Sequence, residues 1–412
     1  MMQERTILMI GTYDTKEDEL AFLRGVIEAQ GGKVCALDIS VLGDTAMPVE
    51  ISKHQVAEAA GTTMAGVIAS GDEATAMELM SLGAVRLARD LVASVACHGM
   101  IALGGTMGTD LALDVALALP LGVPKYIVST VAFSPIIPPD RLPADIQMIL
   151  GSGGLYGLNA ICRSALAQAA GAVLGAARAA IPLDRSMPLV GVTSLGNSCL
   201  KYMKRLKPAL AARGFDTAFF HSTSMGGRAF EGLAAQGAFC CVMDLCLQEF
   251  GNAQHGSIVS SGASRLQSAG RAGVPQIVAP GATDMVDLPT WRPIPEVFAS
   301  SPLHVHNKLI TSVMLDGPAR RKTARAAGEC LNAAKGPTHV ILPLLGIEEW
   351  DREGDGLHDP AALAEFMDEF RTTLKAPVQV TEIDAHINDE AFVAAVLVVF
   401  DDWVARGIVR AG

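Results

Sequence analysis

The stretch HGMIALGGTMGTDLAL, from His98 to Leu113, changes character twice along its length. The apolar run that ends at Leu103 is typical of a buried strand, and the pattern that resumes at Leu111 is typical of a helix. The segment 104–109 between them is rich in glycine and threonine, but no Gly-Lys-Thr or Gly-Lys-Ser follows, so it is not a Walker loop. It is either a phosphate-binding loop or a tight glycine turn whose threonine caps the next helix.

The same alternation of short apolar runs and longer helical patterns extends along the first half of the chain. Continuous apolar strands that alternate with helices predict a parallel sheet covered by helices on both faces. The predicted strands of this half are 6–11, 33–38, 66–71, 99–105, 125–130 and 146–150.

The pattern restarts after a proline-containing break at 179–188, and a chain of 412 residues favours two domains of about 200 residues each. We predict two Rossmann-like α/β subdomains, 1–184 and 185–412, each a mostly parallel sheet flanked by helices, with a cleft between them. The segment 280–321 is rich in proline and polar residues and is predicted to form loops around that cleft. The predicted strands of the second half are 189–194, 217–222, 240–245, 275–281, 339–344 and 378–384.

The composition limits the partners and the compartment. A formal net charge of −11 without a block of Lys or Arg argues against a general nucleic-acid or membrane-surface binder. Eight cysteines in no zinc-ligand spacing are typical of reduced thiols in a cytosolic protein. No uncharged apolar stretch approaches the roughly 20 residues that span a bilayer. We therefore expect a cytoplasmic protein without a membrane or nucleic-acid partner.

Ligands of open parallel sheets bind beyond the carboxyl ends of the strands, so the residues directly after the first-half strands are candidates for nucleotide binding. Glycines in 104–109 would let the backbone approach a phosphate, and the helix that follows offers unpaired amides. The segment GTYDTKEDEL (11–20) supplies a second loop, although Asp14 or Thr15 is equally suited to cap a helix. Asp38 is the candidate ribose ligand. The full set is Gly11, Thr12, Asp14, Thr15, Lys16, Asp38, Gly71, Gly104, Gly105, Thr106, Gly108, Thr109 and Thr130.

The second half carries a different set of polar residues. HSTSMGGRAFEGL (221–233) places Arg228 at a helix start, where it would bind a carboxylate or phosphate. His304 and His306 lie on one face of any extended segment; we prefer hydrogen-bonded loop histidines to a metal site there and predict no protein metal centre. The candidate ligand residues are Gly226, Gly227, Arg228, Glu231 and His306. The candidate acid–base residues are His221, Asp244, Asp284 and His386.

The motifs GTYDTKEDEL, HGMIALGGTMGT, LGVPKYIVST, HSTSMGGRAFE, PGATDMVD and HVHNKL, taken in order, resemble one family. It is the family of bacterial, fungal and plant proteins related to the ATP-binding N-terminal region of the tomato protein that confers resistance to tomato mosaic virus. The resemblance implies two Rossmann-like subdomains, an ATP site in the first of them, and a homodimer. The chain departs from the family pattern at 191–198 and in the segment MILGSGGLYGLN (148–159), which leaves the ligand of the second subdomain open.

Three hypotheses for the function follow, and whether the protein is an enzyme stays open between them. The first is a protein that binds ATP with Mg²⁺ in the first subdomain and a small carboxylate in the cleft. The second is a nucleotide-independent lyase or hydrolase of sugar-acid catabolism. The third is a non-enzymatic binding module that responds to nucleotide.

Overall fold

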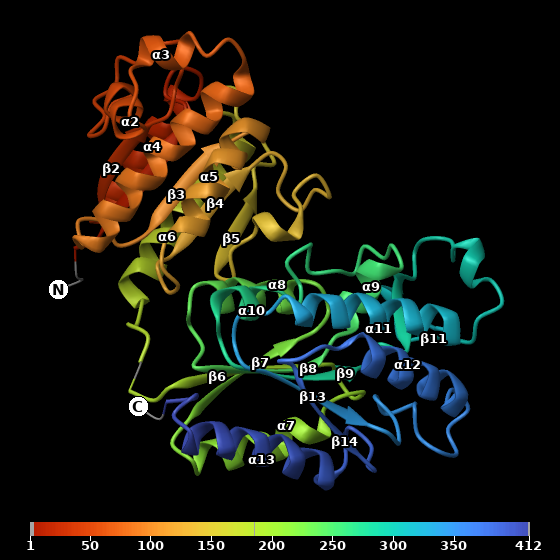
Figure 1. The fold of residues 1–412 in the computed structure, drawn as a ribbon. Helices are drawn as coiled ribbons and strands as arrows, with labels where there is room; N and C mark the ends of the chain where they lie inside the picture. Colours follow the sequence, from red (N-terminus) through yellow and green to blue (C-terminus); the bar gives the residue numbers. More distant parts are fainter. Residues whose placement is uncertain (1–3, 185, 411–412) are drawn as a thin grey trace. The chain divides into compact units, whose positions relative to one another are not determined.

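The computed structural model describes residues 4–184 and 186–410 and divides the chain into two compact units. The N-terminal unit extends to Leu183, and the C-terminal unit begins at Asp184. Each unit is built on its own parallel sheet with helices on both faces, which confirms the predicted α/β class (Figure 1).

The N-terminal unit contains five parallel strands in the order β2-β1-β3-β4-β5. Five of the six strands predicted for this half are present. Their bounds are β1 (Thr6–Gly11), β2 (Lys33–Asp38), β3 (Met100–Gly104), β4 (Lys125–Ser129) and β5 (Ile146–Leu150).

Alternate side chains of each central strand enter two separate cores, because successive residues of a strand point to opposite faces. Ile7 and Met9 pack under α1 and α6, whereas Leu8 and Ile10 pack under the helices of the other face. Both faces are therefore covered, which explains why these strands are apolar throughout. The helices are α1 (Glu17–Ala29), α2 (Lys53–Ala59), α3 (Met64–Ile68), α4 (Glu73–Ala93), α5 (Thr106–Ala118), α6 (Ala160–Ala179) and the short 3₁₀ helix η1 (Pro139–Arg141).

The strand predicted at 66–71 is wrong, because this segment forms the end of α3 and the turn that follows it. The Thr63 hydroxyl caps α3 by accepting a hydrogen bond from the Gly66 amide at 3.1 Å. A short apolar run has no periodicity that separates a buried strand from one turn of helix. Gly71 lies in the turn before α4 with a φ of +94° and does not follow a strand.

The C-terminal unit contains six parallel strands in the order β14-β13-β9-β8-β6-β7. All six were predicted, with ends that differ by one residue at most. Their bounds are β6 (Leu189–Ser194), β7 (Asp216–His221), β8 (Cys241–Cys246), β9 (Gln276–Gly281), β13 (Thr338–Pro343) and β14 (Gln379–Ile383).

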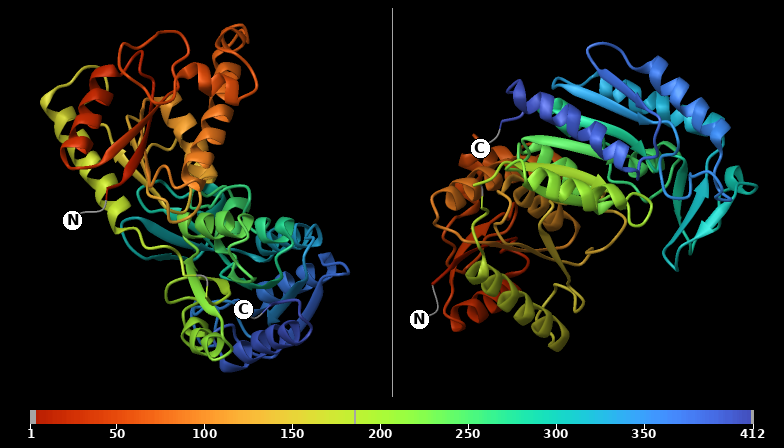
Figure 2. Two further views of the ribbon diagram at one scale, coloured as in Figure 1. Left: turned by 90° about the vertical axis from the view of Figure 1, so that its left-hand side faces the viewer. Right: turned by 90° about the horizontal axis from the view of Figure 1, so that it is seen from below.

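Helices cover both faces of this sheet as well (Figures 1 and 2). One core joins β6, β8 and β9 to α7 and α13, and a second joins β9 and β13 to α9, α11 and α12. The helices of the unit are α7 (Lys201–Ala211), α8 (Met225–Ala235), α9 (Gln248–Gln254), α10 (Ser268–Ala272), α11 (Gly317–Asn332), α12 (Pro360–Thr373), α13 (Glu390–Ala405) and the 3₁₀ helix η2 (Glu296–Phe298).

The segment 280–321, predicted as loops, contains a small antiparallel sheet in the order β10-β12-β11. Its strands are β10 (Met285–Pro289), β11 (Leu303–Val305) and β12 (Ile310–Met314). Prolines at 289, 293, 295 and 302 and the short length of β11 concealed the strands in the sequence. This sheet carries His304 and His306, so it decides where those histidines lie.

Among the described residues, α6 alone has the length and hydropathy of a membrane-spanning helix. Its Leu166, Val173 and Leu174 are buried in the core shared with α1 and the sheet.

Candidate functional site

Each sheet has one point where the strand order reverses, and the carboxyl ends of the strands open a crevice there. In the N-terminal unit this switch point lies between β1 and β3, and in the C-terminal unit it lies between β6 and β8. The loops after these four strands are therefore the places where each unit would hold a ligand.

The loop after β3 brings a helix start close to the sheet. A Cβ on Gly104 would lie 2.7 Å from the Gly108 Cα, so only glycine allows α5 to begin this close to the strand. Gly105 is the N-cap of α5 and has no side chain to cap it, and Thr106 is exposed. A Cβ on Gly105 would meet only the Thr130 hydroxyl, at 3.8 Å. The first amides of α5 thus face open space beside Thr106 and Thr130.

Thr109, predicted as a ligand residue, has a structural role. Its side chain is buried, with 2 % exposed, and its hydroxyl shares a 2.7 Å hydrogen bond with the Ser129 hydroxyl. This bond joins the first turn of α5 to the end of β4.

The loop after β1 borders the same switch point. The hydroxyls of Thr12 and Thr15 lie 2.8 Å apart, and the ammonium of Lys16 donates to the Leu155 carbonyl at 3.2 Å. A Cβ on Gly11 would lie 2.8 Å from the Leu20 side chain, which explains the glycine there. Lys16 is half-buried at the start of α1 and lies on the carboxyl edge of the sheet.

The two predicted acids of this edge order the loop that follows β2. Asp38 is 3 % exposed, and its Oδ1 accepts hydrogen bonds from the Ser40 amide at 2.9 Å and the Ser40 hydroxyl at 2.5 Å. Asp14 accepts a 3.1 Å bond from the Gly43 amide through Oδ2, while its Oδ1 is buried without a hydrogen-bond partner. Gly71 lies in the α3–α4 turn, so the strand-end argument for its role does not apply.

The C-terminal unit has a cavity of about 400 Å³ at its carboxyl edge. The loops after β6, β7, β8 and β13 contribute to it, and β10, β11 and β12 form one wall. It is lined by Leu195, Gly196, Asn197, Ser198, His221, Thr223, Gln248, Met285, Asp287, His304, His306, Asn307, Ile310, Ser312 and Trp350. The structure therefore brings together the predicted residues His221 and His306, which are separated by four strands in the sequence.

His221 ends β7 and lies on the rim of the cavity with an exposed side chain. Its Nδ1 accepts a 3.3 Å hydrogen bond from the Gly196 amide. Because partial burial lowers its pKa below the ordinary value, the ring is neutral at neutral pH and its proton resides on Nε2.

His306 lies on the opposite wall and belongs to a chain of hydrogen bonds. Ser312 donates to the Asp287 carboxylate, and the His306 Nε2 lies 3.0 Å from the Ser312 Oγ. Asp287 and Ser312 are buried, whereas His306 is exposed on the rim. Partial burial lowers the pKa of His306, and burial raises the pKa of the Asp287 carboxyl.

An aromatic group adjoins the two histidines of this wall. The Trp350 ring centroid lies 4.5 Å from that of His304 and 5.1 Å from that of His306. Trp350 lies in the loop after β13, so this stack joins that loop to the small sheet.

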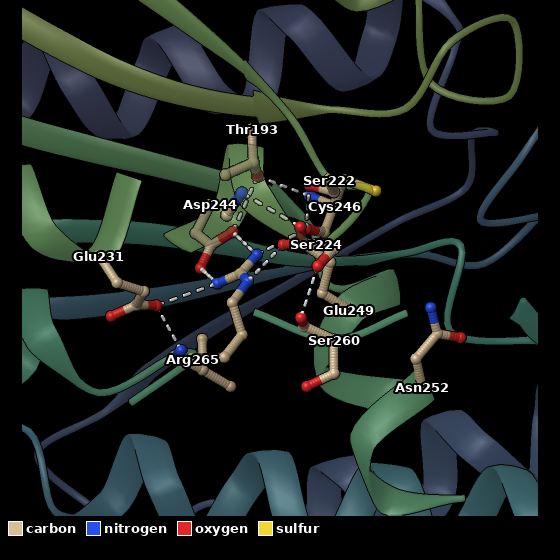
Figure 3. A network of polar contacts seen from close by, with 12 residues as sticks. Thr193, Ser222, Ser224, Glu231, Asp244, Cys246, Glu249, Asn252, Ser260 and Arg265 are labelled. Carbon is tan, nitrogen blue, oxygen red and sulfur yellow. Dashed lines mark hydrogen bonds and ion pairs between the residues drawn. The ribbon is translucent and has the colours of Figure 1, made fainter. Parts of the chain in front are cut away.

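Beneath the edge lies a buried ion-pair network centred on Arg265, which the sequence reasoning missed (Figure 3). The Arg265 guanidinium donates to Asp244 at 2.5 and 2.7 Å, to Glu249 at 3.1 Å and to Glu231 at 3.3 Å. All four side chains are nearly inaccessible to solvent. Burial raises the pKa of Glu249 to about 7, although Arg265 opposes the shift.

Two of the predicted site residues, Asp244 and Glu231, lie in this network. Asp244 does not line the cavity, because Arg265 and the Thr193 hydroxyl hold its carboxylate in the interior. Glu231 is not at a ligand surface, because it accepts bonds from the Leu266 and Ser268 amides beside Arg265.

The start of α8 packs closely against the rest of the unit. A Cβ on Gly226 would lie 1.9 Å from the His221 carbonyl oxygen, and one on Gly227 would lie 1.7 Å from the Glu249 carboxylate. The Gly227 amide donates to that carboxylate at 3.1 Å, and Arg228 donates to the Ser264 hydroxyl at 3.3 Å. The glycines therefore serve close packing, and the Gly227 amide is occupied by an internal carboxylate.

The remaining acid–base candidates lie in the interior. Asp284 is fully buried, and burial raises its pKa to about 7. His386 donates from Nε2 to the Glu348 carbonyl at 2.7 Å, and its Nδ1 accepts from the Asn388 amide at 3.1 Å. Both ring nitrogens of His386 are occupied, so it has a structural role.

Across residues 4–184 and 186–410, no three or more His, Cys, Asp and Glu side chains form a group suited to a metal ion.

Comparisons with known proteins agree along the whole chain. The model of the N-terminal domain of the uncharacterised protein family UPF0261 matches residues 5–182, and that of its C-terminal domain matches residues 187–404. The chain is similar to a UPF0261 protein of Brucella melitensis, with 53% identity over 98% of this chain and 97% of that one. A UPF0261 protein of Clostridium tetani is 33% identical over 95% and 97%.

The resemblance predicted from the motifs extends to a plant relative. The chain is 26% identical to the ToMV resistance protein Tm-1(GCR237) of Solanum lycopersicum, over 95% of this chain and 55% of that protein.

Proposed function

The chain belongs to the UPF0261 family, and we propose that its N-terminal unit binds ATP with Mg²⁺ at the switch point between β1 and β3. The observation that carries the proposal is the uncapped start of α5 directly after Gly104 and Gly105. Helix amides without partners, together with the positive end of the helix dipole, bind phosphate without a lysine.

The side chains around this loop fit a nucleoside triphosphate. The hydroxyls of Thr106 and Thr130 lie beside the amides and would donate to phosphate oxygens. Lys16 lies on the same edge and would exchange its bond to the Leu155 carbonyl for a phosphate oxygen.

The carboxylate that fits the Mg²⁺ ion is Asp14. Its buried Oδ1 lacks a hydrogen-bond partner and would hold one of the waters that Mg²⁺ keeps when phosphates bind it. Asp110 and Asp114 do not fit as well, because Arg141 pairs with both at 2.8 and 2.9 Å. When bound, the ion would neutralise phosphate charge that the backbone amides do not.

Titration calorimetry with Mg-ATP on the full chain tests the proposal. Gly105→Ala adds a Cβ that meets nothing closer than 3.8 Å, so the fold is retained while the approach of a phosphate is blocked. We expect at least a tenfold weaker Kd for this variant. Gly25→Ala, whose Cβ meets nothing within 4 Å on α1, is the matched control and should bind as the parent does.

Two results would contradict the proposal: no heat from the parent chain, or an unchanged Kd in Gly105→Ala. Turnover of ATP by the parent chain would favour an enzyme, and binding without turnover would favour a nucleotide-responsive module. The homodimer and the cytoplasmic location stay predictions.

A further inference from the structure

The cavity of the C-terminal unit contains an arrangement that the nucleotide proposal does not use. Its walls offer three carboxamides and two further hydroxyls, from Asn197, Gln248, Asn307, Ser198 and Thr223, beside the indole of Trp350. Among the described residues that line it there is no Lys or Arg, and Asp287 is the one carboxylate.

This lining selects against an anionic ligand. A carboxylate placed here would lose water without gaining a cation, and it would face the charge of Asp287. Carboxamides and hydroxyls both donate and accept hydrogen bonds, and an aromatic face packs against C–H groups. The cavity is therefore suited to a small neutral polyhydroxylated molecule, in place of the small carboxylate expected from the sequence.

The two rim histidines are held in the same Nε2–H tautomer but leave different ring nitrogens for a ligand. The Ser312 hydroxyl donates its hydrogen bond to Asp287, so its oxygen accepts a hydrogen bond from His306. His306 consequently carries its proton on Nε2 and presents the lone pair of Nδ1. His221 accepts from the Gly196 amide at Nδ1 and consequently presents a proton on Nε2. One ring is prepared to accept a proton and the other to donate a hydrogen bond.

We propose that this cavity is a catalytic site for proton transfer in a neutral aldose or ketose, with His306 as the general base and His221 as the hydrogen-bond donor to the carbonyl oxygen. The proposal concerns the C-terminal unit and is independent of nucleotide binding.

The step needs no co-reactant. His306 Nδ1 takes the proton from the carbon next to the carbonyl, and the electrons of that C–H bond form the C=C bond of an enediolate. The carbonyl oxygen takes the negative charge and accepts the hydrogen bond from His221 Nε2. Return of a proton from His306 to the former carbonyl carbon, together with transfer of the adjacent hydroxyl proton to the former carbonyl oxygen, gives the isomeric sugar. Asp287 and Ser312 act as positioning residues, because they fix the tautomer of His306 without contacting the substrate.

The experiment is deuterium exchange. The full chain is incubated in D₂O with a panel of neutral aldoses and ketoses of three to six carbons, and NMR measures deuterium at the carbon next to the carbonyl. Exchange reports the proton abstraction itself, whatever isomer is the final product. We expect the parent chain to label at least one of these sugars.

Two near-isosteric variants test the roles. His306→Gln keeps a donor toward Ser312 but removes the base, and His221→Asn keeps an acceptor for the Gly196 amide but removes the Nε2 proton. Each should lower the exchange rate at least 100-fold, the scale of acid–base catalysis, while the Kd for the sugar changes less than threefold. His54→Gln, on the surface of the N-terminal unit, should exchange as the parent does.

Three results would overturn the proposal. The first is no labelling of any neutral sugar by the parent chain. The second is faster labelling of the corresponding sugar acids, because that would contradict the charge argument. The third is tight Zn²⁺ binding that is lost in His306→Gln, because it would make the histidines metal ligands.

Discussion

The carboxyl edges of the two sheets occupy equivalent positions in their units, but they are built differently. The N-terminal edge offers backbone amides and hydroxyls from loops that each lie within one short stretch of sequence, such as 104–109. The C-terminal edge offers side chains from strand ends and from a separate small sheet, with a buried arginine beneath them. A site made of backbone is recognisable in local sequence, whereas a site made of distant side chains needs the fold to assemble it.

We expect the largest loss of stability from a substitution of Arg265 at the C-terminal edge. Replacing it with methionine leaves Asp244, Glu231 and Glu249 buried without their cation, and breaking a buried pair in this way costs about 3–5 kcal/mol. We expect Arg265→Met to unfold at much lower urea concentration than the parent, as followed by circular dichroism. Arg325→Met, which removes an exposed pair with Glu369, is the control and should change little. Parent-like stability of Arg265→Met would show that the C-terminal edge does not depend on this network.

At the N-terminal edge we expect a smaller loss of stability, which differs between the adjacent glycines Gly104 and Gly105. Gly104→Ala forces a Cβ to within 2.7 Å of the Gly108 backbone, and overpacking of this kind costs about 1–3 kcal/mol. Gly105→Ala meets no such obstacle and should lower the stability by less, by about 1 kcal/mol at most, because alanine is a poorer N-cap than glycine. Thermal unfolding of both variants tests this difference. Equal losses of stability would mean that α5 does not approach β3 as closely as the structure shows.

The sequence predicted the large sheets well because their central strands, such as β3, β8 and β9, are buried on both faces and read as uninterrupted apolar runs. It failed at 66–71, where a short apolar run belongs to a helix capped by Thr63, and at 280–321, where prolines interrupt the strands. In both places the information that decides the structure lies outside the local pattern.

The residues of the C-terminal candidate site were likewise predicted only in part. The sequence predicted His221 and His306 near one ligand, but it did not predict β10, β11 and β12, the strands that bring His306 to the cavity. The sequence did not identify Asp287 on β10 or Ser312 on β12 as site residues. Both line the cavity, but neither strand was predicted. Arg265 lies between α9 and α10 and does not directly follow a strand. A search of the residues that follow predicted strands therefore does not include it.

A third prediction concerns Asp284, which is buried where the sequence placed a catalytic acid. Burial raises its pKa to about 7, whereas in the unfolded chain it returns to the ordinary value near 4. The folded protein therefore binds a proton that the unfolded chain lacks between about pH 4 and pH 7, so this group lowers the stability as the pH rises through that range. Asp284→Asn should remove this part of the pH dependence and gain stability relative to the parent at pH 8 more than at pH 5. Urea unfolding at both pH values tests it, and an equal difference at the two values would contradict the buried, protonated state.

The smallest effect tests the role assigned to Thr109. In Thr109→Val the hydroxyl that bonds to Ser129 is lost while the volume of the side chain is kept, and a single buried hydrogen bond contributes about 1 kcal/mol. Ser129 retains the bond in which its oxygen accepts from the Val131 amide, so its hydroxyl is not left without a partner. We expect a loss of about 1 kcal/mol in urea unfolding with an unchanged Kd for Mg-ATP, because Thr109 faces the sheet while Thr106 faces the solvent. A weaker Kd at unchanged stability would move Thr109 into the phosphate site and make the N-terminal edge, like the C-terminal one, a site built from side chains.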